Sequence, residues 1–345
     1  MTSPRAHGLV AFAAFALAAV LCAQGARAEN IAIPGYGNLT LFATANLGVN
    51  VEDGKLGDTV SASDDQDLQS VKSLVGIDWQ WDVGHSYKVL GHYEYGGQVS
   101  DIEDTWDDAR PFKSWFGFEN FLGKFTFGKQ PLAFKQYYGT FIDKSQAFYA
   151  TGYTTPHAGG LELSSDLVKF STSIGKLEFD LDYRPDGPNG DQRIERRFGA
   201  GIRYRQWLSR FSFGAAFDHE EQRAGTPVNR LGGAAEYGSE QWSLAAGAHL
   251  VTDSSDADTK SFNLLATIQV RPDNELHLSL ATVVDEDLYD GYLGGGYYVD
   301  HKIGSQFRLY SEGAATWVDA VRGSDSLMSY RLLFGVRYDF GNVWY

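Results

Sequence analysis

Hydrophobic and polar residues alternate one by one over most of the chain. In residues 39–49, every second position beginning with Leu39 is apolar, and most positions between them are polar or small. The same alternation recurs in residues 177–184, 242–250 and 261–270. Because successive side chains of a β-strand point to opposite faces, this period of two predicts strands with one apolar and one polar face. No segment of this part shows the spacing of three and four residues that is typical of an amphipathic helix.

The predicted strands are long, and aromatic residues lie near many of their ends. Strands of soluble proteins average about 5–6 residues. Most of these run for about 9–13 residues, close to the length of about 9–11 that a tilted strand needs to cross a bilayer. The pattern predicts sixteen strands, at 36–50, 70–82, 86–98, 111–120, 124–130, 165–173, 176–184, 194–205, 208–220, 229–238, 241–252, 260–270, 274–285, 290–299, 304–318 and 327–340.

Short and long connections alternate along this list. The connections at 83–85, 121–123 and 174–175 are short, and the one over 131–164 is the longest. Bacterial outer-membrane barrels have an even number of strands, short periplasmic turns and longer external loops. The sequence therefore predicts an all-β fold, a transmembrane antiparallel β-barrel of 16 strands that forms a single domain over 29–345.

The first 28 residues are typical of a signal peptide. They contain a basic residue, Arg5, then an apolar run over 8–23, and they end with an Ala-Arg-Ala sequence at Ala28. This order of basic, apolar and small residues marks a cleaved secretory signal, so we expect export and cleavage after Ala28. A lipoprotein signal at Cys22 is the alternative, but Leu21 is larger than the residue expected before such a cysteine.

Composition excludes several classes of function. The full chain has a net charge of −15, and the signal peptide takes away Arg5 and Arg27 but no acid. An acidic mature chain without a basic cluster is not expected to bind nucleic acid. The only cysteine of the full chain is Cys22, which lies in the predicted signal peptide, so we expect neither a disulfide nor a thiolate metal site in the mature protein.

Catalytic motifs are lacking as well. The chain has no G-x-S-x-G nucleophile elbow, and His219-Glu220 lacks the second histidine of a zinc helix. Both His249 and His277 have the parity of the inner face, whereas barrel lipases place histidine on the lipid face. We therefore expect no enzyme activity, no cofactor and no metal ion.

The last predicted strand, 327–340, carries an apolar row that ends at Phe340. This row resembles the carboxy-terminal signal that outer-membrane barrels present to their insertion machinery, in which the aromatic residue is usually the last of the chain. Here five more residues follow, up to Tyr345. We expect Phe340 to close the barrel and to take the role of that terminal aromatic residue.

Three short stretches make the chain resemble the general, trimeric porins of Gram-negative bacteria. Residues 39–49 are similar to their first strand, 73–84 to their second strand and first turn, and 124–130 (KFTFGKQ) to their fifth strand, which ends in Gly-Arg-Gln. The resemblance implies a homotrimer in the outer membrane whose pores pass small hydrophilic solutes and ions by passive diffusion. It also implies that the loop over 131–164 is the long third external loop folded into the pore.

In these porins, the inward loop carries acids that face basic residues on the opposite wall. On this pattern, Lys129 matches the arginine that ends the fifth strand, and Lys169 matches a basic residue early in the sixth strand. Lys129 shares its parity with Phe125 and Phe127, so we expect it to reach the lumen only if a β-bulge intervenes at Gly128.

Other positions depart from the family pattern. Leu74 and Thr44 occupy positions where basic residues are usual in the family. Lys72 lies two residues before Leu74, so it belongs to the same inward-facing row. The acids of the loop are Asp143 and Glu162. We therefore expect a weaker transverse field than in the best-known members.

Inward positions on the strands carry both signs of charge in similar numbers. These charges either form a ring that filters ions or pair with neighbours across strands. The excess of acids falls in external loops, such as 52–67 and 101–108, where it enriches cations, binds lipopolysaccharide through divalent cations, or is simply solvated. The candidate residues of the lumen are Lys72, Lys129, Asp143, Glu162, Lys169, Arg184, Arg197, Arg203 and Arg205.

The function that these observations favour is passive diffusion of small hydrophilic solutes and ions through an outer-membrane pore, with a weak preference for cations. A substrate-selective channel is an alternative. Sugar selectivity would need a line of aromatic residues along the lumen, whereas the inward rows are mostly Gly, Ala, Ser and charged residues. Anion selectivity would need a ladder such as Arg197, Arg203 and Arg205. The third possibility is a barrel that acts as an adhesin or an enzyme.

Overall fold

The computed structural model describes most of the predicted barrel. The predicted signal peptide, residues 1–28, lies outside the described part, as do Glu162 and the residues after Phe340. The described residues are 30–33, 37–54, 67–99, 110–144, 163–185, 194–205, 210–222, 227–253, 258–284, 289–301, 307–319 and 327–340.

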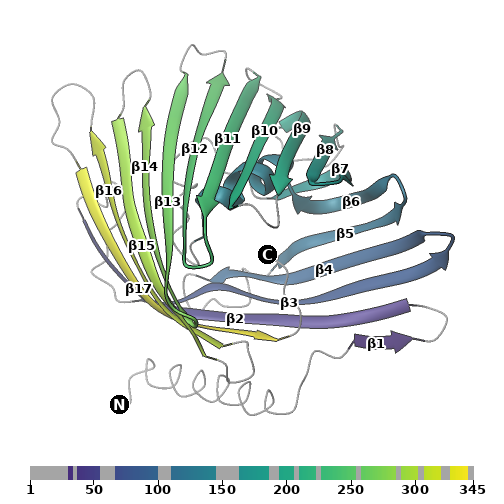
Figure 1. Cartoon of the computed structure of the whole chain (residues 1–345), viewed down its shortest axis with the longest axis horizontal. Helices are drawn as coiled ribbons and strands as arrows, with labels where there is room; N and C mark the ends of the chain where they lie inside the picture. Colours follow the sequence, from purple (N-terminus) through teal and green to yellow (C-terminus); the bar gives the residue numbers. More distant parts are fainter. Residues whose placement is uncertain are drawn as a thin grey trace, which may run out of the picture.

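All the strands belong to one sheet (Figure 1). From β2 onward, each strand pairs antiparallel with the next, and β17 pairs back with β2, so β2–β17 close into a barrel. The predicted fold, an antiparallel barrel of 16 strands, is therefore confirmed. The strands are β1 (Asn30–Ile33), β2 (Gly37–Gly54), β3 (Asp67–Gly84), β4 (Tyr87–Val99), β5 (Arg110–Asn120), β6 (Gly123–Pro131), β7 (Leu163–Ile174), β8 (Leu177–Arg184), β9 (Ile194–Arg205), β10 (Phe211–Gln222), β11 (Val228–Gly238), β12 (Trp242–Asp253), β13 (Thr259–Arg271), β14 (Asn274–Val284), β15 (Tyr289–His301), β16 (Phe307–Asp319) and β17 (Leu327–Phe340).

Two features of the first strands differ from the prediction. β2 and β3 extend further than expected, because their backbone pairing continues through polar residues beyond the alternating segments. β1 was not predicted, since four residues are too few to show a period. It pairs with Gly37–Thr40 of β2, next to the stretch that pairs with β17 from Ala43 onward.

The two faces of the sheet differ as the alternation predicts. On β13, Phe262 and Leu264 are exposed, whereas Ser261 and Asn263 are buried. Leu264 lies opposite Leu280 of β14, which is exposed as well. A continuous apolar outer face is the surface that such barrels present to lipid, and the polar inner face lines the lumen.

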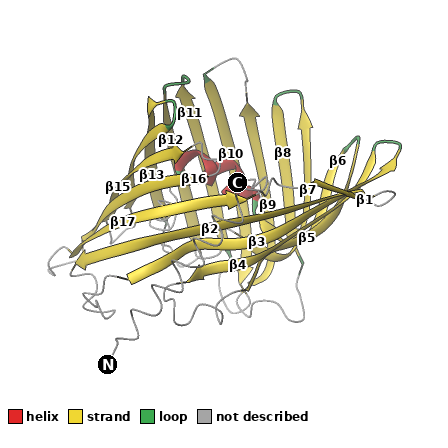
Figure 2. Ribbon diagram, turned by 90° about the horizontal axis from the view of Figure 1, so that it is seen from below, coloured by secondary structure: helices red, strands yellow, loops and turns green. Residues whose placement is uncertain are grey.

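After β6, the chain turns into the barrel. It forms η2 (Lys135–Gly139), a short π-helix, and α2 (Thr140–Ile142), which lie inside the ring of strands (Figures 1 and 2). We call residues 132–144 the inward segment. It is the described part of the predicted third loop, and residues 145–162 lie outside the described part. Within the described residues, no helix is long and apolar enough to cross a membrane.

The inward segment packs against a patch of small residues on the inner wall. Phe134, Tyr137 and Tyr138 form a buried cluster with Ala216 and Ala234, and η2 and α2 contact β9–β13. Four glycines complete the patch, because a Cβ atom there would lie within 3 Å of an atom of the segment. They are Gly201, Gly214, Gly232 and Gly247.

Gly214→Ala is expected to lower the stability of the folded barrel. The added methyl group would lie 2.0 Å from the carbonyl oxygen of Tyr137, and forcing extra atoms into a packed site costs about 1–3 kcal/mol. The readout is the temperature at which the compact form converts to the unfolded form on unboiled gels. Gly233→Ala on the outer face is the control, because its nearest neighbour would be 3.9 Å away. Equal transition temperatures for the two variants would contradict this packing.

Candidate functional site

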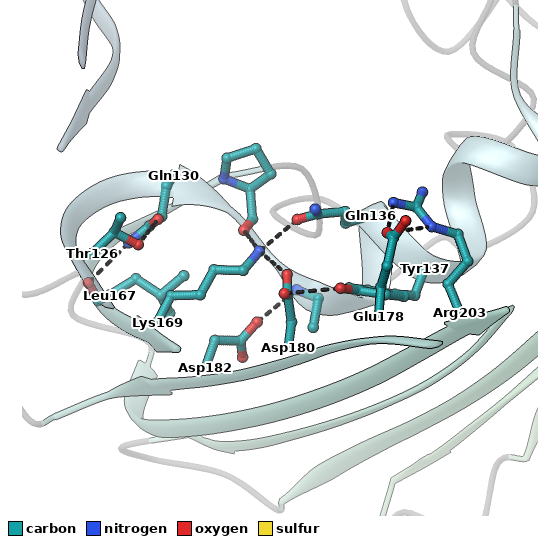
Figure 3. A network of polar contacts seen from close by, with 12 residues as sticks. Thr126, Gln130, Gln136, Tyr137, Leu167, Lys169, Glu178, Asp180, Asp182 and Arg203 are labelled. Carbon is teal, nitrogen blue, oxygen red and sulfur yellow. Dashed lines mark hydrogen bonds and ion pairs between the residues drawn. The ribbon is translucent and has the colours of Figure 1, made fainter. Parts of the chain in front are cut away.

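The start of the inward segment is held by Lys169 of β7. Its Nζ lies 2.7 Å from Asp180 Oδ2 and donates to the Pro131 carbonyl at 3.1 Å and to Gln136 Oε1 at 2.6 Å (Figure 3). Both Lys169 and Asp180 are buried. Lys169, which was predicted as a lumen residue, therefore joins the wall to the loop.

Two carboxylates of β8 also bind the segment. Asp182 accepts a hydrogen bond from the backbone N–H of Ala133 at 2.6 Å, and Asp180 accepts one from the Tyr137 hydroxyl at 2.8 Å (Figure 3). Burial, and then the nearby Asp180 carboxylate, raise the pKa of the Tyr137 hydroxyl, so it remains protonated and able to donate. These inward charges of the wall thus fix the segment rather than line open lumen.

The middle of the segment is bound to β12 and β13. The Tyr138 hydroxyl lies 2.9 Å from His249 Nδ1 and accepts a hydrogen bond from Asn263 Nδ2 at 2.9 Å. Ser261 Oγ lies 2.7 Å from the same histidine nitrogen. His249 has the predicted inward position, but it serves as an anchor for the segment.

Two residues of opposite charge, Asp143 and Lys144, lie at the end of the inward segment. Asp143 lies 3.7 Å from Lys135, and Lys144 Nζ donates to Glu236 of β11 at 2.8 Å. A small cleft beside them is lined by Asp143, Lys144, His277 and residues of β15 and β16. Asp143 therefore lies inside the barrel.

Arginines of β9 and β11 form a buried network with acids of β10. Arg197 makes two hydrogen bonds to Asp218, at 2.6 and 3.0 Å. Arg230 donates to Asp218 at 2.7 Å and to Glu220 at 3.0 Å. Arg184 lies opposite Arg197 on β8 and is buried as well. This arrangement agrees with the interpretation that the wall charges pair across strands.

The two remaining arginines that were predicted for the lumen, both on β9, differ in exposure. Arg203 donates to Glu178 through two nitrogens and lies over the ring of Tyr137 at 5.2 Å. Arg205 lies 3.9 Å from Glu178, and 55% of its side chain is exposed. Arg205 is thus the most accessible of the predicted arginines that the structure describes.

Lys129 does not reach the lumen. The ladder between β6 and β7 is irregular here, but the extra residue lies in β7 near Asp166, which has a φ of 57°. Lys129 therefore stays on the row of Phe125 and Phe127, and its Nζ donates to the carbonyl of Pro111 at 2.8 Å. The bulge that would turn it inward is not at Gly128. Lys72 lies in β3, but its side chain is outside the described part.

The opposite wall, formed by β3–β5, carries a second charged cluster. Asp78, His92 and Glu94 interact directly, and Lys113 joins them through Glu94. Alternation places Asp78, His92 and Glu94 on the inner face, but the sequence shows no spacing that brings residues of three strands together. His92 could therefore not be identified as a site residue from the sequence, and the same holds for Tyr137 and Tyr138.

Comparisons with known proteins agree with this geometry. The sequence profile of the Gram-negative porin family matches residues 8–342. None of the curated proteins matches the sequence.

Solved structures share the fold at low sequence identity. An anion-selective porin from Comamonas acidovorans is 16% identical with a TM-score of 0.69, covering 88% of this chain and 98% of that one. The outer membrane channel DcaP of Acinetobacter baumannii is 13% identical with a TM-score of 0.71, covering 90% and 100%. The trimer form of OmpT from Vibrio cholerae is 14% identical with a TM-score of 0.65, covering 88% and 100%.

Lys169→Met is expected to loosen the inward segment. The substitution leaves the buried Asp180 carboxylate without this ammonium group, and breaking a buried pair costs about 3–5 kcal/mol. Hydrogen–deuterium exchange of peptides covering 132–144 should therefore become faster by at least about tenfold. Lys176→Met, in the exposed turn after β7, is the matched control and should leave exchange unchanged. Equal exchange in all three proteins would show that Lys169 does not hold the segment.

Proposed function

This chain belongs to the Gram-negative porin family, and we propose that its pore discriminates little among small hydrophilic solutes and prefers cations only weakly. Family and fold make it an integral protein of the outer membrane that forms a channel for passive diffusion. They indicate a channel rather than an enzyme.

The observation that carries the proposal is the pairing of charge along the inner wall. Arg197 and Arg230 bind Asp218, and Arg203 binds Glu178. A paired arginine contributes little net field along the ion path, since the two charges cancel at distances longer than their separation. An arginine ladder that would attract anions is therefore disfavoured, although the similar Comamonas protein is anion-selective.

The aromatic residues of the inward segment do not support sugar selectivity. Phe134, Tyr137 and Tyr138 each have at most 3% of their surface exposed, because they pack on the glycine and alanine patch of the wall. A ring that is covered on both sides cannot stack against a passing sugar. The small residues on the inner face of the wall thus form the packing surface for the inward segment.

Planar-bilayer recordings test this proposal. We expect currents that rise linearly with voltage and a reversal potential in a KCl gradient that lies on the cation side, far from that of an ideally selective pore. Arg205→Gln removes an exposed inner charge and should raise the ratio of K⁺ to Cl⁻ permeability by about twofold. Arg196→Gln is the matched control, since Arg196 is similarly exposed, at 57%, but has outward parity. A strong anion preference of the wild type would overturn the proposal.

We also propose that the protein is a homotrimer and that residues 1–28 are removed on export. The trimer is supported by the resemblance to general porins and by the trimer form of OmpT, which has the same fold. Phe340 is proposed as the residue that the insertion machinery reads, because β17 ends there, opposite Ala43. The acidic external loops are proposed to bind lipopolysaccharide through divalent cations.

Phe340→Ala is expected to reduce assembly, whereas Tyr345→Ala is not. Loss of the aromatic end of the last strand should weaken recognition during insertion, so less protein should reach the outer membrane. The readout is the amount of the slow, heat-sensitive band that a trimer gives on unheated gels of outer membranes. If only Tyr345→Ala lowers that band, the last residue of the chain carries the signal. If the wild type gives no such band, the trimer proposal fails.

A further inference from the structure

The wall of β3–β5 holds a histidine whose two ring nitrogens both face carboxylates. His92 Nδ1 lies 2.6 Å from Asp78 Oδ1, and Nε2 lies 3.0 Å from Glu94 Oε1. A carboxylate oxygen accepts hydrogen bonds, and a neutral imidazole has only one N–H to donate. Only the doubly protonated imidazolium can therefore donate to Asp78 and Glu94 together.

Aromatic rings cover both sides of this histidine. The ring of Phe42 from β2 stacks on His92 at 5.7 Å between centroids, with an interplanar angle of 24°. The ring of Trp115 from β5 stacks on it at 5.3 Å and 11°. The faces of aromatic rings attract cations, so the stack also favours the charged imidazolium. It fixes the plane of the ring in which both nitrogens reach their carboxylates.

The charges around His92 are balanced only while it is protonated. Asp78 of β3 and Glu94 of β4 supply two negative charges, and Lys113 of β5 supplies one positive charge, with its Nζ 3.0 Å from Glu94 Oε1. Lys124 of β6 lies further along the stack, 5.2 Å from the ring of Trp115, and the acid Glu119 of β5 lies directly opposite it in the ladder, so these two residues add no net charge. Loss of the proton from His92 leaves one negative charge of the Asp78–Glu94 pair without compensation.

That negative charge faces the lumen. The side chain of Asp78 is 33% exposed, whereas those of His92 and Glu94 are 12% and 3% exposed. A neutral imidazole has one N–H, so it donates to only one of the two carboxylates. The second carboxylate then carries its negative charge without a hydrogen bond from His92. The wall of β3–β5 lies across the barrel from β10–β13 (Figure 1), so a charge on it acts on ions that pass between the two walls.

We infer that His92 determines how the ion selectivity of this channel depends on pH. The inference rests on the proposed function, a weakly selective diffusion channel. At low pH, the imidazolium neutralises the cluster, so the wall attracts neither cations nor anions. As the pH rises and His92 loses its proton, the wall gains a net negative charge and the channel favours cations.

The test is the reversal potential in a KCl gradient, measured for the reconstituted protein between about pH 5 and pH 9, the range in which histidine titrates. For the wild type, we expect the ratio of K⁺ to Cl⁻ permeability to rise by about twofold across this range, as one charge near the ion path is added. In His92→Gln, which keeps a polar side chain but carries no titrating group, the ratio should stay constant. His85→Asn in the exposed turn between β3 and β4 is the matched control and should follow the wild type.

A second variant keeps the inference testable if His92→Gln does not fold. Asp78→Asn removes one carboxylate of the cluster, so its whole curve should shift toward anions by about twofold. A wild-type curve that is flat, or a rise that persists in His92→Gln, would overturn the inference while leaving the diffusion channel intact. Absence of conductance in every protein would instead contradict the proposed function.

Discussion

A polypeptide backbone that crosses lipid has to satisfy its own hydrogen bonds. No water in the bilayer core can bind an open strand edge, so a sheet is stable there only when it closes. Pairing of β17 with β2 closes this sheet. Closure turns one face of every strand to lipid and the other to a common lumen. The alternation of side chains then decides the chemistry of both faces.

The inward segment enters the closed barrel, and it needs a complementary surface on the inner wall to pack against. Its aromatic residues fit against the wall only where the wall lacks side chains, as at Gly214 and Gly232. Charged groups also bind the segment, with Lys169 and Asp180 at its start and Glu236 at its end. The pairing matters because a buried charge is tolerated only beside an opposite one. The same inner face therefore serves as packing surface and as pore wall.

The charges that remain on the wall are mostly engaged with one another. Arg197 and Arg230 share Asp218, which holds β9, β10 and β11 together across the barrel wall. Such pairs rigidify the wall but cancel much of its field. Selectivity then depends on the few groups whose charge is exposed or can change. The net charge of the cluster around His92 can change, because it depends on one proton.

The sixteen strands, their inner and outer faces and the place of the long loop in the chain can all be predicted from the residues. These features depend on the period of two, which each strand carries in its own residues. The register between strands is different, because it depends on residues far apart in the chain. No local pattern places Tyr138 beside Asn263, or His92 between Phe42 and Trp115. Lys129, by contrast, keeps the direction that alternation sets within its own strand, because the extra residue lies in the neighbouring β7, near Asp166. Which inward side chains hold the loop and which face the pore follows only from the folded barrel, because these contacts are made between residues of different strands.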